Sequence, residues 1–374
     1  MKIVYCIINT WYSGGLTRVL ANKADALVAM GHDVTIITTD QFDKAHHYPM
    51  SDKIKFIDLN INYVEHDQKS VYKKAVLIPW KIYLHKKRLS KVLKDIKADI
   101  VISLFYKDIF FLPSIKDGSK KILEAHSSRY TWTHSREERG IISKIQNWLD
   151  LFLIKKFDRF VVLTHEDLPY WGKLDNIEVI PNANTFESHD LSTLENKKTM
   201  AAGRYDYQKN FEGLLDVWKL VVDKCPDWSL DIIGDGVFKE LLVRKIQDLK
   251  LNSSVNLVPT TPNIKSHYIN SSVYVMTSRY EGLGMVLLEA QACGVPLVSY
   301  DCQCGPKDII DDGQNGFLIP FGNTKRMAEK LIYLMNNELV RKEMGKKAKI
   351  YSKNFSEEKI MNRWIELFTK LKAS

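Results

Sequence analysis

Two glutamates stand eight residues apart in the segment SRYEGLGMVLLEA, with a Gly-x-Gly loop between them. The run VYVMT before Glu281 is typical of a buried strand, and the run around Glu289 is typical of a helix. A carboxylate at the end of such a strand can accept hydrogen bonds from several sugar hydroxyl groups. The alternative is a helix-terminal acid at Glu281 and a solvated Glu289, although VLLEAQA is an unusual place for a free carboxylate.

The backbone amides between the two glutamates are a second candidate for ligand binding. The helix is expected to begin near Gly284, and the first amides of a helix have no partner within it. Such amides can hold an anion, and the helix dipole adds to the attraction. We therefore expect a phosphate or sugar hydroxyls at Leu283, Gly284, Met285 and Val286.

Two cations, Arg204 and Lys209, stand five residues apart in GRYDYQKN, between a strand and a helix. They could clamp two phosphates through charge-assisted hydrogen bonds, worth roughly 1.5–3 kcal/mol each, or be solvated surface residues. The chain contains no Asp-x-Asp pair, the usual cation holder of metal-dependent single-domain sugar-nucleotide enzymes. The sequence therefore predicts diphosphate binding by side-chain cations and helix amides, with no metal and no other cofactor.

Two further candidates follow apolar runs near the N-terminus and at mid-domain. The turn Ser13-Gly14-Gly15 comes after KIVYCIIN and opens a helix, so its amides could approach an anion. It lacks the full G-x-G-x-x-G fingerprint and could be an ordinary turn. His126 ends the run KILEAH, which places it on the ligand side of a parallel sheet; a residue that merely caps the strand end is the alternative.

The elements that must position these residues alternate between strand and helix. Strand-like runs recur from 2–9 to 159–164, a turn-rich segment at 181–198 interrupts them, and the alternation restarts at 199–203. This pattern predicts an α/β protein with two Rossmann-like, doubly wound domains that face a central cleft. We expect an N-terminal domain at 1–183, joined by the C-terminal helix 357–374, and a C-terminal domain at 184–356, with 325–371 helical.

Composition narrows the class of protein. Of the 374 residues, 45% are apolar and 26% are charged, which excludes a disordered chain and a membrane bundle. No apolar run approaches the roughly 20 residues of a membrane span, and KIVYCIIN is expected to be a first strand rather than a signal peptide. Five cysteines without a metal-ligand pattern are expected to be thiols in a reducing cytosol.

Most of the net charge of +9 falls in one window. Nine basic residues and one acid lie between Lys73 and Lys97, so this basic stripe carries +8. Such a stripe indicates an anionic partner. We expect the anionic surface of the inner membrane and no nucleic acid; a solvated basic helix is the alternative.

A second stretch has helical spacing of large apolar residues. It contains Ile141, Ile145, Trp148, Leu149 and Phe152. It could shape the acceptor side of a site, but we favour core packing as its explanation.

Together these residues resemble a retaining glycosyltransferase of family four with the GT-B fold. The resemblance is strongest over 278–319, where the paired glutamates, A-C-G-x-P and D-G-x-N-G-F-L follow in order. The Gly14-Gly15 turn, the I-P-N at 180–182 and GRYDYQKN match independently. The segment GPKDII at 305–310 resembles enzymes that make bacterial lipopolysaccharide, capsule and exopolysaccharide.

The resemblance implies a role for each matching residue. Glu281 and His126 would act at the transferred sugar, with Glu281 as a positioning group rather than a nucleophile. Glu289 would bind the ribose hydroxyls, and Arg204 and Lys209 would bind the diphosphate and stabilise the leaving group. The implied donor-binding set is Gly14, Gly15, Arg204, Lys209, Leu283, Gly284, Met285, Val286 and Glu289.

The resemblance also implies the reaction. A hexosyl unit would pass from a nucleoside-diphosphate sugar, most commonly a UDP-sugar, to a saccharide or polyprenyl-linked saccharide during cell-surface polysaccharide synthesis. The protein would be cytoplasmic or peripheral on the cytoplasmic face of the inner membrane. Two other classes stay open: a non-hydrolysing sugar-nucleotide epimerase, against which the paired-glutamate block speaks, and a non-catalytic protein that binds a nucleotide sugar or nucleic acid.

Overall fold

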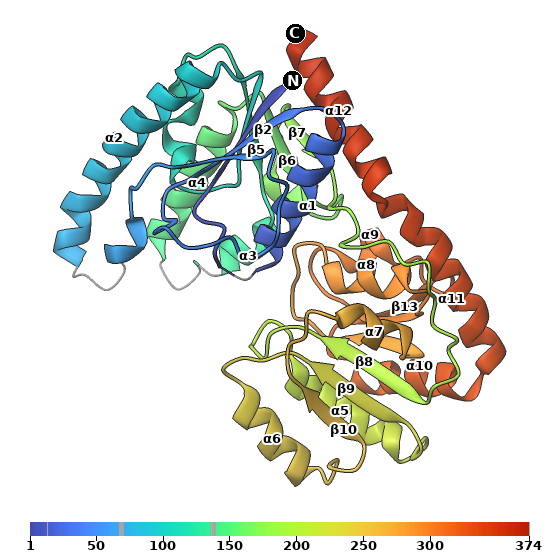
Figure 1. Cartoon of the computed structure of the whole chain (residues 1–374). Coiled ribbons are helices and arrows are strands. Elements are labelled where there is room, and N and C mark those ends of the chain that lie inside the picture. The colour runs from blue at the N-terminus through green and yellow to red at the C-terminus, as the bar shows by residue number, and fades with distance from the viewer. Residues whose placement is uncertain (13, 67–70, 135, 137–139, 374) are drawn as a thin grey trace.

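Two parallel β-sheets, each with helices on both faces, make up the structure (Figure 1). It is a computed structural model that describes residues 1–12, 14–66, 71–134, 136 and 140–373. The first sheet has the order β3-β2-β1-β4-β5-β6-β7, and the second has the order β10-β9-β8-β11-β12-β13. Neighbouring described strands pair in parallel throughout. The predicted pair of doubly wound α/β sheets is confirmed.

The first sheet is built from short strands, which are buried in the middle of the sheet and partly exposed in the edge strands β3 and β7. They are β1 (Lys2–Ile7), β2 (Asp33–Thr38), β3 (Lys55–Asp58), β4 (Ile100–Ser103), β5 (Lys120–Glu124), β6 (Arg159–Val162) and β7 (Ile177–Val179). Its larger helices are α1 (Gly15–Ala29), α2 (Val71–Ile96), α3 (Arg129–His134) and α4 (Ile141–Ile154), with single turns η1 (Tyr63–His66), η2 (Lys107–Phe110), η3 (Leu112–Ser114) and η5 (Leu168–Trp171). Helices α2 and α4 pack on one face of this sheet, and α1 packs on the other.

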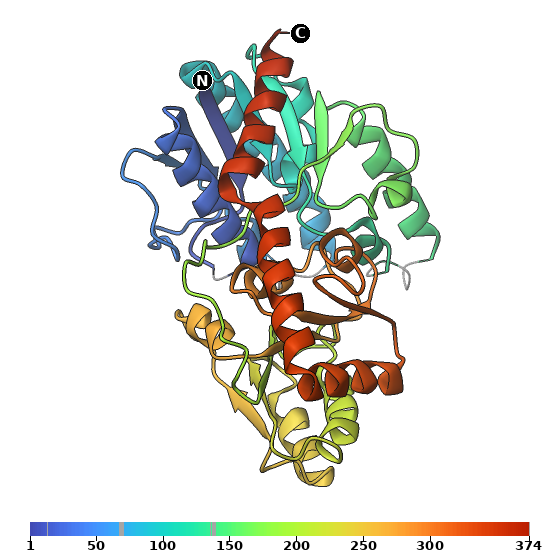
Figure 2. The ribbon, with the colours of Figure 1, turned by 90° about the vertical axis from the view of Figure 1, so that its right-hand side faces the viewer.

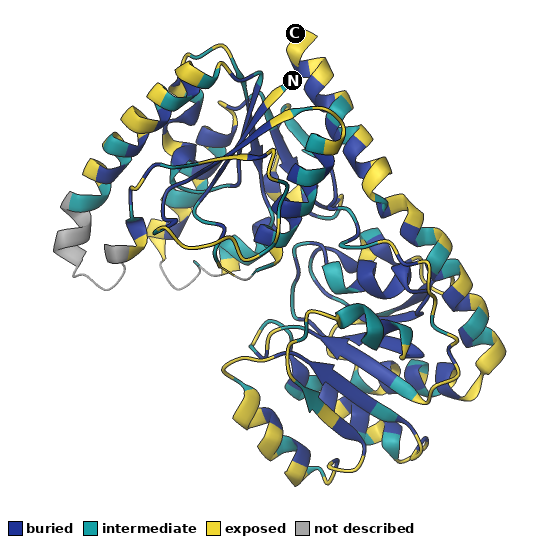
Figure 3. Cartoon of the chain, viewed as in Figure 1, coloured by how far each residue is buried: buried dark blue, intermediate teal, exposed yellow. Residues whose placement is uncertain are grey.

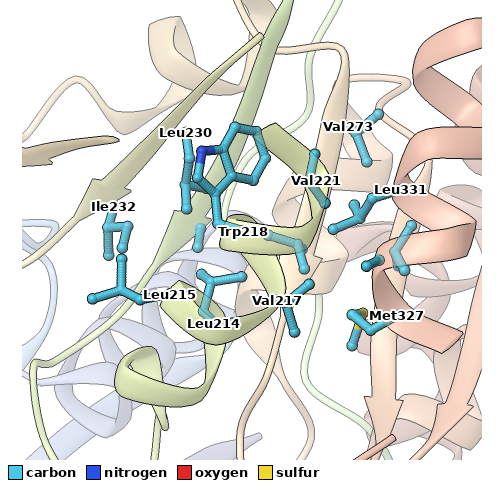
Figure 4. Packing of buried hydrophobic residues seen from close by; sticks show 14 of the residues in the cluster. Leu214, Leu215, Val217, Trp218, Val221, Leu230, Ile232, Val273, Met327 and Leu331 are labelled. Carbon is cyan, nitrogen blue, oxygen red and sulfur yellow. The ribbon is translucent and has the colours of Figure 1, made fainter. Parts of the chain in front are cut away.

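The second sheet repeats the pattern. Its strands are β8 (Lys198–Ala202), β9 (Ser229–Ile233), β10 (Val255–Val258), β11 (Val273–Met276), β12 (Leu297–Asp301) and β13 (Gly316–Pro320). Its helices are α5 (Phe211–Val222), α6 (Lys239–Asp248), α7 (Ile264–Ile269), α8 (Met285–Ala292), α9 (Pro306–Ile309), α10 (Thr324–Asn336) and α11 (Glu338–Ser352). The fully buried Trp218 of α5 lies at the centre of the core between this sheet, α5 and α10 (Figure 4).

The helical tail is broken rather than continuous. Helix α11 begins directly after Asn337, and the single turn η6 (Lys353–Phe355) separates α11 from α12 (Glu357–Ala373). Figure 2 shows α12 running from the second sheet back along the first. Its apolar side joins the core that contains β1 and α1, and its members are Ile360, Met361, Trp364, Leu367, Phe368 and Leu371. The chain thus crosses between the two sheets twice, once through 180–197 and once through α12.

One expectation about packing is wrong for most of its residues. In the apolar stretch of α4, Leu149 packs against the core, but Ile141, Ile145 and Trp148 do not, because their side chains are 76%, 60% and 66% exposed. The helix carries two apolar stripes, and the stripe with Leu153 and Ile154 faces the sheet instead. Helical spacing identifies an apolar stripe but does not say which of two stripes is buried.

The burial pattern follows the sheets. The inner strands of both sheets are largely buried and the edge strands β3, β7 and β10 are not, whereas the outward sides of α2 and α12 alternate between exposed and intermediate residues (Figure 3). Among the described helices, none combines the length and the hydropathy that crossing a bilayer requires.

Candidate functional site

The candidate site lies where the carboxyl ends of the two sets of strands meet. A Cβ atom added to Gly282, after β11, would lie 2.6 Å from the carbonyl oxygen of His126, after β5. Only glycine therefore lets these two loops approach so closely. As a result, the structure brings Glu281 and His126 to the same junction, although they belong to different sheets.

Lys209 and Glu281 form an ion pair at this junction. Lys209 Nζ lies 2.7 Å from Glu281 Oε1, and the two side chains are only 15% and 8% exposed. The backbone positions both groups, since the Lys209 amide donates to Asp206 Oδ1 (3.1 Å) and the Glu281 amide donates to the Gln303 carbonyl (3.0 Å). The pair is possible because β8 and β11 are neighbours in the sheet, so that the loops after them lie side by side.

Arg204 occupies a different environment from Lys209. Its side chain is 75% exposed and lies 3.3 Å from a carboxylate oxygen of Asp206. The structure thus brings Lys209, but not Arg204, to Glu281. An exposed guanidinium held by a single surface ion pair is free to turn toward a ligand, because such pairs are weak.

The loop between the two glutamates ends in a helix N-terminus, as expected. Gly284 is the N-cap of α8 and adopts a left-handed conformation with φ of 88°. Leu283 buries its side chain in the core, so only its backbone can face a ligand. The first-turn amides of Met285 and Val286 are left without intrahelical partners at this end of α8.

Glu289 is buried rather than solvated, so the alternative for this residue is wrong. One carboxylate oxygen accepts a hydrogen bond from the Tyr268 hydroxyl at 2.8 Å, and the other accepts one from the Thr185 hydroxyl. Burial and the adjacent Glu289 raise the pKa of Tyr268 well above its ordinary value. The carboxylate therefore already serves as an acceptor for two hydroxyl groups, which is the chemistry expected of it toward a ribose.

The middle of helix α1 contacts the segment that reaches Glu289 through Thr185. Gly14 is the N-cap of α1 in an extended conformation, and a Cβ atom on Gly15 would meet no atom within 4 Å. Asn22 of α1 donates to the carbonyl oxygen of Thr185 at 3.1 Å. Ser13, the first residue of the predicted turn, lies outside the described residues.

His126 belongs to a buried ionic chain that sequence reasoning missed. Its Nε2 lies 3.0 Å from Glu124 Oε1, the same oxygen that pairs with the Lys23 ammonium. Lys23 Nζ in turn lies 3.9 Å from the ring centroid of Trp364 in α12. Burial raises the pKa of Glu124, but Lys23 and His126 outweigh burial and bring it down to about 2.

The sequence carried a signal for each member of this chain. Glu124 stands within the buried strand run KKILE, and Lys23 stands among the apolar residues of the α1 stripe. Charged groups are almost never fully buried unless they are paired, so each position predicted a partner of opposite charge.

Two further contacts join the halves beside the site. Tyr280, next to Glu281, has its ring 6.1 Å from Tyr130 and 6.2 Å from His134 of α3. Asp308, in the GPKDII segment, accepts hydrogen bonds from the His165 amide (2.7 Å) and the Glu166 amide (3.3 Å) after β6. The GPKDII segment therefore connects the second half of the molecule to the loop after β6.

No cluster of three or more metal-ligating side chains occurs among the residues that the structure describes. The five cysteines are all buried, and none forms a disulfide.

Comparison with known proteins decides the family. Residues 13–183 match the family Glycosyltransferase Family 4, and residues 185–351 match the family Glycosyl transferases group 1. An uncharacterized glycosyltransferase of Haemophilus influenzae is 30% identical over 369 residues, which cover 97% of this chain and 98% of that protein. The chain belongs to the glycosyltransferases of family four.

Two further proteins extend the comparison. The glycosyltransferase is 27% identical over 382 residues to the GalNAc-alpha-(1->4)-GalNAc-alpha-(1->3)-diNAcBac-PP-undecaprenol alpha-1,4-N-acetyl-D-galactosaminyltransferase of Campylobacter jejuni, covering 100% of this chain and 99% of that one. It superposes on a Staphylococcus aureus TarM variant, solved with fondaparinux, alpha-GlcNAc-glycerol and UDP, with a TM-score of 0.78 and 19% identity, covering 98% and 99% of the two chains. The GT-B fold is thereby shown.

Proposed function

We propose that this glycosyltransferase moves a hexosyl unit, with retention of anomeric configuration, from a UDP-sugar to a glycan or lipid-linked glycan in cell-surface polysaccharide synthesis. The observation that carries the proposal is the buried Lys209–Glu281 pair at 2.7 Å, placed against the His126 loop of the other sheet. The UDP in the TarM structure and the undecaprenol-linked glycan in the name of the Campylobacter enzyme support the choice of donor and acceptor.

In the proposed reaction, the bond between the anomeric carbon and the diphosphate oxygen breaks as the acceptor hydroxyl bonds to the same face of that carbon. The departing phosphate oxygen takes the proton of the acceptor. Negative charge therefore grows on the diphosphate, where Lys209, Arg204 and the N-termini of α1 and α8 would stabilise it. The hydrogen bond from the Lys209 amide to Asp206 fixes the backbone of this loop, so only the side chains of Lys209 and Arg204 must turn to reach the diphosphate.

The remaining roles concern the sugar and the nucleoside. Glu281 would accept hydrogen bonds from sugar hydroxyls while Lys209 turns to the diphosphate, and Glu289 would accept ribose hydroxyls. His126, held by Glu124, would contact the transferred sugar from the first sheet. With cations and helix amides available for the diphosphate, we propose that no divalent metal is required.

Only some cations of the basic stripe at 73–97 are part of the proposal. Lys81 donates to the Asn62 carbonyl, and Arg88 donates to the carbonyls of Leu59 and Asn60, so both tie α2 to the chain beside it. The side chains of Lys73 and Lys74 lie outside the described residues. The exposed cations left for an anionic membrane on the cytoplasmic side are Lys86, Lys87, Lys91, Lys94 and Lys97.

A panel of nucleotide sugars tests the proposal. A ligand that binds only the folded state raises its melting temperature, so UDP and one UDP-sugar should do so and other nucleotides should not. That sugar should then be transferred to a saccharide acceptor, and proton NMR of the product should show the anomeric configuration of the donor. An inverted product would contradict retention. Conversion of the donor sugar without an acceptor would favour an epimerase.

A further inference from the structure

The segment that follows β12 contacts the loop between the two glutamates through its backbone. Residues 302–308 are named here the coupling segment. The Gln303 carbonyl accepts a hydrogen bond from the Glu281 amide at 3.0 Å. A Cβ atom on Gly305 would lie 2.3 Å from the Leu283 carbonyl oxygen, so the two backbones are in direct contact there. The coupling segment therefore holds the glutamate loop at two points.

The coupling segment also contacts the loop after β6, which belongs to the first sheet. Cys304, the residue between the two contacts with the glutamate loop, donates its amide to Glu166 Oε2 at 3.1 Å. Asp308 makes the reverse contact, since its carboxylate accepts hydrogen bonds from the His165 amide (2.7 Å) and the Glu166 amide (3.3 Å). Each half of the molecule thus supplies a carboxylate that holds backbone amides of the other half.

The two carboxylates that make this connection are largely shielded from water. The side chains of Glu166 and Asp308 are 16% and 11% exposed. Lys307 balances their charge, because its ammonium nitrogen lies 3.4 Å from Glu166 Oε1. Hydrogen bonds from backbone amides to an ionised carboxylate are about twice as strong as those between neutral groups. The connection is therefore stronger than a contact between exposed surface side chains, which contributes little.

The backbone of Cys304 has an unusual conformation. Cys304 is fully buried, and its φ of 65° lies in the left-handed region, which residues with a side chain rarely adopt. Such a conformation persists only where the surroundings over-determine it. Here Glu166 holds the Cys304 amide, and the Cys304 thiol lies 3.5 Å from Asp167 Oδ1. The position of the coupling segment therefore depends on the first sheet as well as on its own strand.

We infer that Glu166 and Asp308 are positioning residues for sugar transfer. Through the coupling segment they place Glu281, the residue that the proposed function assigns to the transferred sugar. The first sheet therefore sets the geometry of a sugar site that is built on the second sheet. The inference rests on the proposed function for the identity of the ligand, but the connection between the two loops requires neither donor nor acceptor.

Binding of UDP and of the transferred UDP-sugar by the full-length protein tests the inference. Glu166→Ala and Asp308→Ala should each bind UDP within about two-fold of the wild type, because neither variant alters Lys209 or Arg204. The ratio of UDP-sugar affinity to UDP affinity should fall by about ten-fold, and kcat should fall similarly, the equivalent of one hydrogen bond. Glu166→Gln keeps an oxygen acceptor for the Cys304 amide and should restore most of both.

Hydrogen exchange of the protein without any ligand tests the connection itself. The amides of 279–290 should exchange about ten-fold faster in Glu166→Ala than in the wild type, because the acceptor of the Glu281 amide is no longer held in place. Asp158→Ala is the matched control, since Asp158 accepts the Lys121 amide at 2.7 Å beside the opposite end of β6. It should leave the exchange of 279–290 and the affinity ratio unchanged. Equal changes in both variants would indicate general loosening and overturn the inference.

A double variant separates an effect through Glu281 from an independent one. If Glu166 acts by placing Glu281, Glu166→Ala/Glu281→Gln should transfer sugar within about three-fold of the rate of Glu281→Gln alone, whereas independent losses would multiply and overturn the inference. Faster exchange in Glu166→Ala together with a wild type that transfers no sugar would leave the connection standing and reject the proposed function. Sugar transfer by the wild type, with exchange and affinity ratio unchanged in the variants, would reject the inference and leave the proposed function standing.

Discussion

The ammonium group of Lys209 and the carboxylate of Glu281 lie 2.7 Å apart, although 72 residues separate them in the chain. The pair occupies the place that the proposed function gives to the donor, between its diphosphate and its sugar. Donor binding must then exchange this contact for two new ones, Lys209 with phosphate and Glu281 with sugar hydroxyls. The two residues should consequently respond differently to substitution.

Removing either cation should weaken diphosphate binding without unfolding the protein. In calorimetric titration with UDP, Lys209→Ala and Arg204→Ala should each lose about 10- to 100-fold in affinity, the equivalent of one charge-assisted hydrogen bond. Lys245→Ala is the control, because Lys245 of α6 also forms an ion pair of 2.7 Å, with Asp216 of α5, but has no role in the proposed site. Unchanged UDP affinity in both loop variants would reject the assignment.

Neutralising Glu281 should separate binding from transfer. Glu281→Gln keeps the shape of the side chain and releases Lys209, so UDP affinity should be equal to or higher than that of the wild type. The transfer rate should fall by about 100-fold, because the neutral amide of glutamine accepts hydrogen bonds from the reacting sugar more weakly than the carboxylate does. Weaker UDP binding together with normal transfer at saturating donor would show that Glu281 serves the nucleotide instead.

The pair of Lys23 and Glu124 should stabilise the fold and position His126, and two variants can separate these effects. Glu124→Gln leaves the buried Lys23 without a counter-charge and should reduce the free energy of unfolding by about 3–5 kcal/mol. Lys23→Met/Glu124→Met replaces the pair by apolar groups and should recover most of that stability. If Glu124 positions His126, the double variant should still show a reduced kcat with unchanged UDP affinity; full recovery of kcat would limit Glu124 to a structural role.

Acid should lower the free energy of unfolding, because Glu124 becomes protonated. Lys23 and His126 overcome the effect of burial and hold the pKa of Glu124 at about 2, against an ordinary value of 4.5. The unfolded chain therefore takes up this proton first as pH falls, so the stabilisation is complete above about pH 4.5 and is lost toward pH 2, by roughly 3 kcal/mol. Melting temperatures at pH 6, 4 and 3 should fall more steeply for the wild type than for Lys23→Met/Glu124→Met.

Chelation should leave the reaction intact. The proposed site balances the diphosphate with Lys209, Arg204 and two helix N-termini, so transfer in excess EDTA should stay within about two-fold of the untreated rate. Activity that disappears in EDTA and returns with magnesium or manganese would show that a cation completes the site.

The fold was predictable where a local sequence pattern identifies each helix or strand. The apolar run at 2–9 predicted β1 (Lys2–Ile7), and the helix expected to begin near Gly284 is α8 (Met285–Ala292). The breaks in the 325–371 tail were missed, because helical spacing continues through Asn337 and reports no change of axis. The exposure of Ile141, Ile145 and Trp148 on α4 was missed because that helix has two apolar stripes and only one of them can face the core.

The sequence indicated the members of the candidate site but not the contacts between them. The paired glutamates, His126 and the two cations could be found from residue type and spacing. The contact between Lys209 and Glu281 depends on β8 lying beside β11, and the contact between His126 and Gly282 depends on how two separate sheets meet. Neither relation is encoded in a local pattern.

The core of the first sheet that contains β1 and α1 is completed by α12, the last helix to be synthesised. Trp364 lies against Lys23, and the apolar side of α12 belongs to the same core as β1 and α1. The ribosome synthesises β1 to β7 first, then the whole second sheet, and only afterwards residues 360–371. The face of the first sheet that α12 covers therefore stays exposed until the last helix has been synthesised, whereas the second sheet already has all its strands and helices.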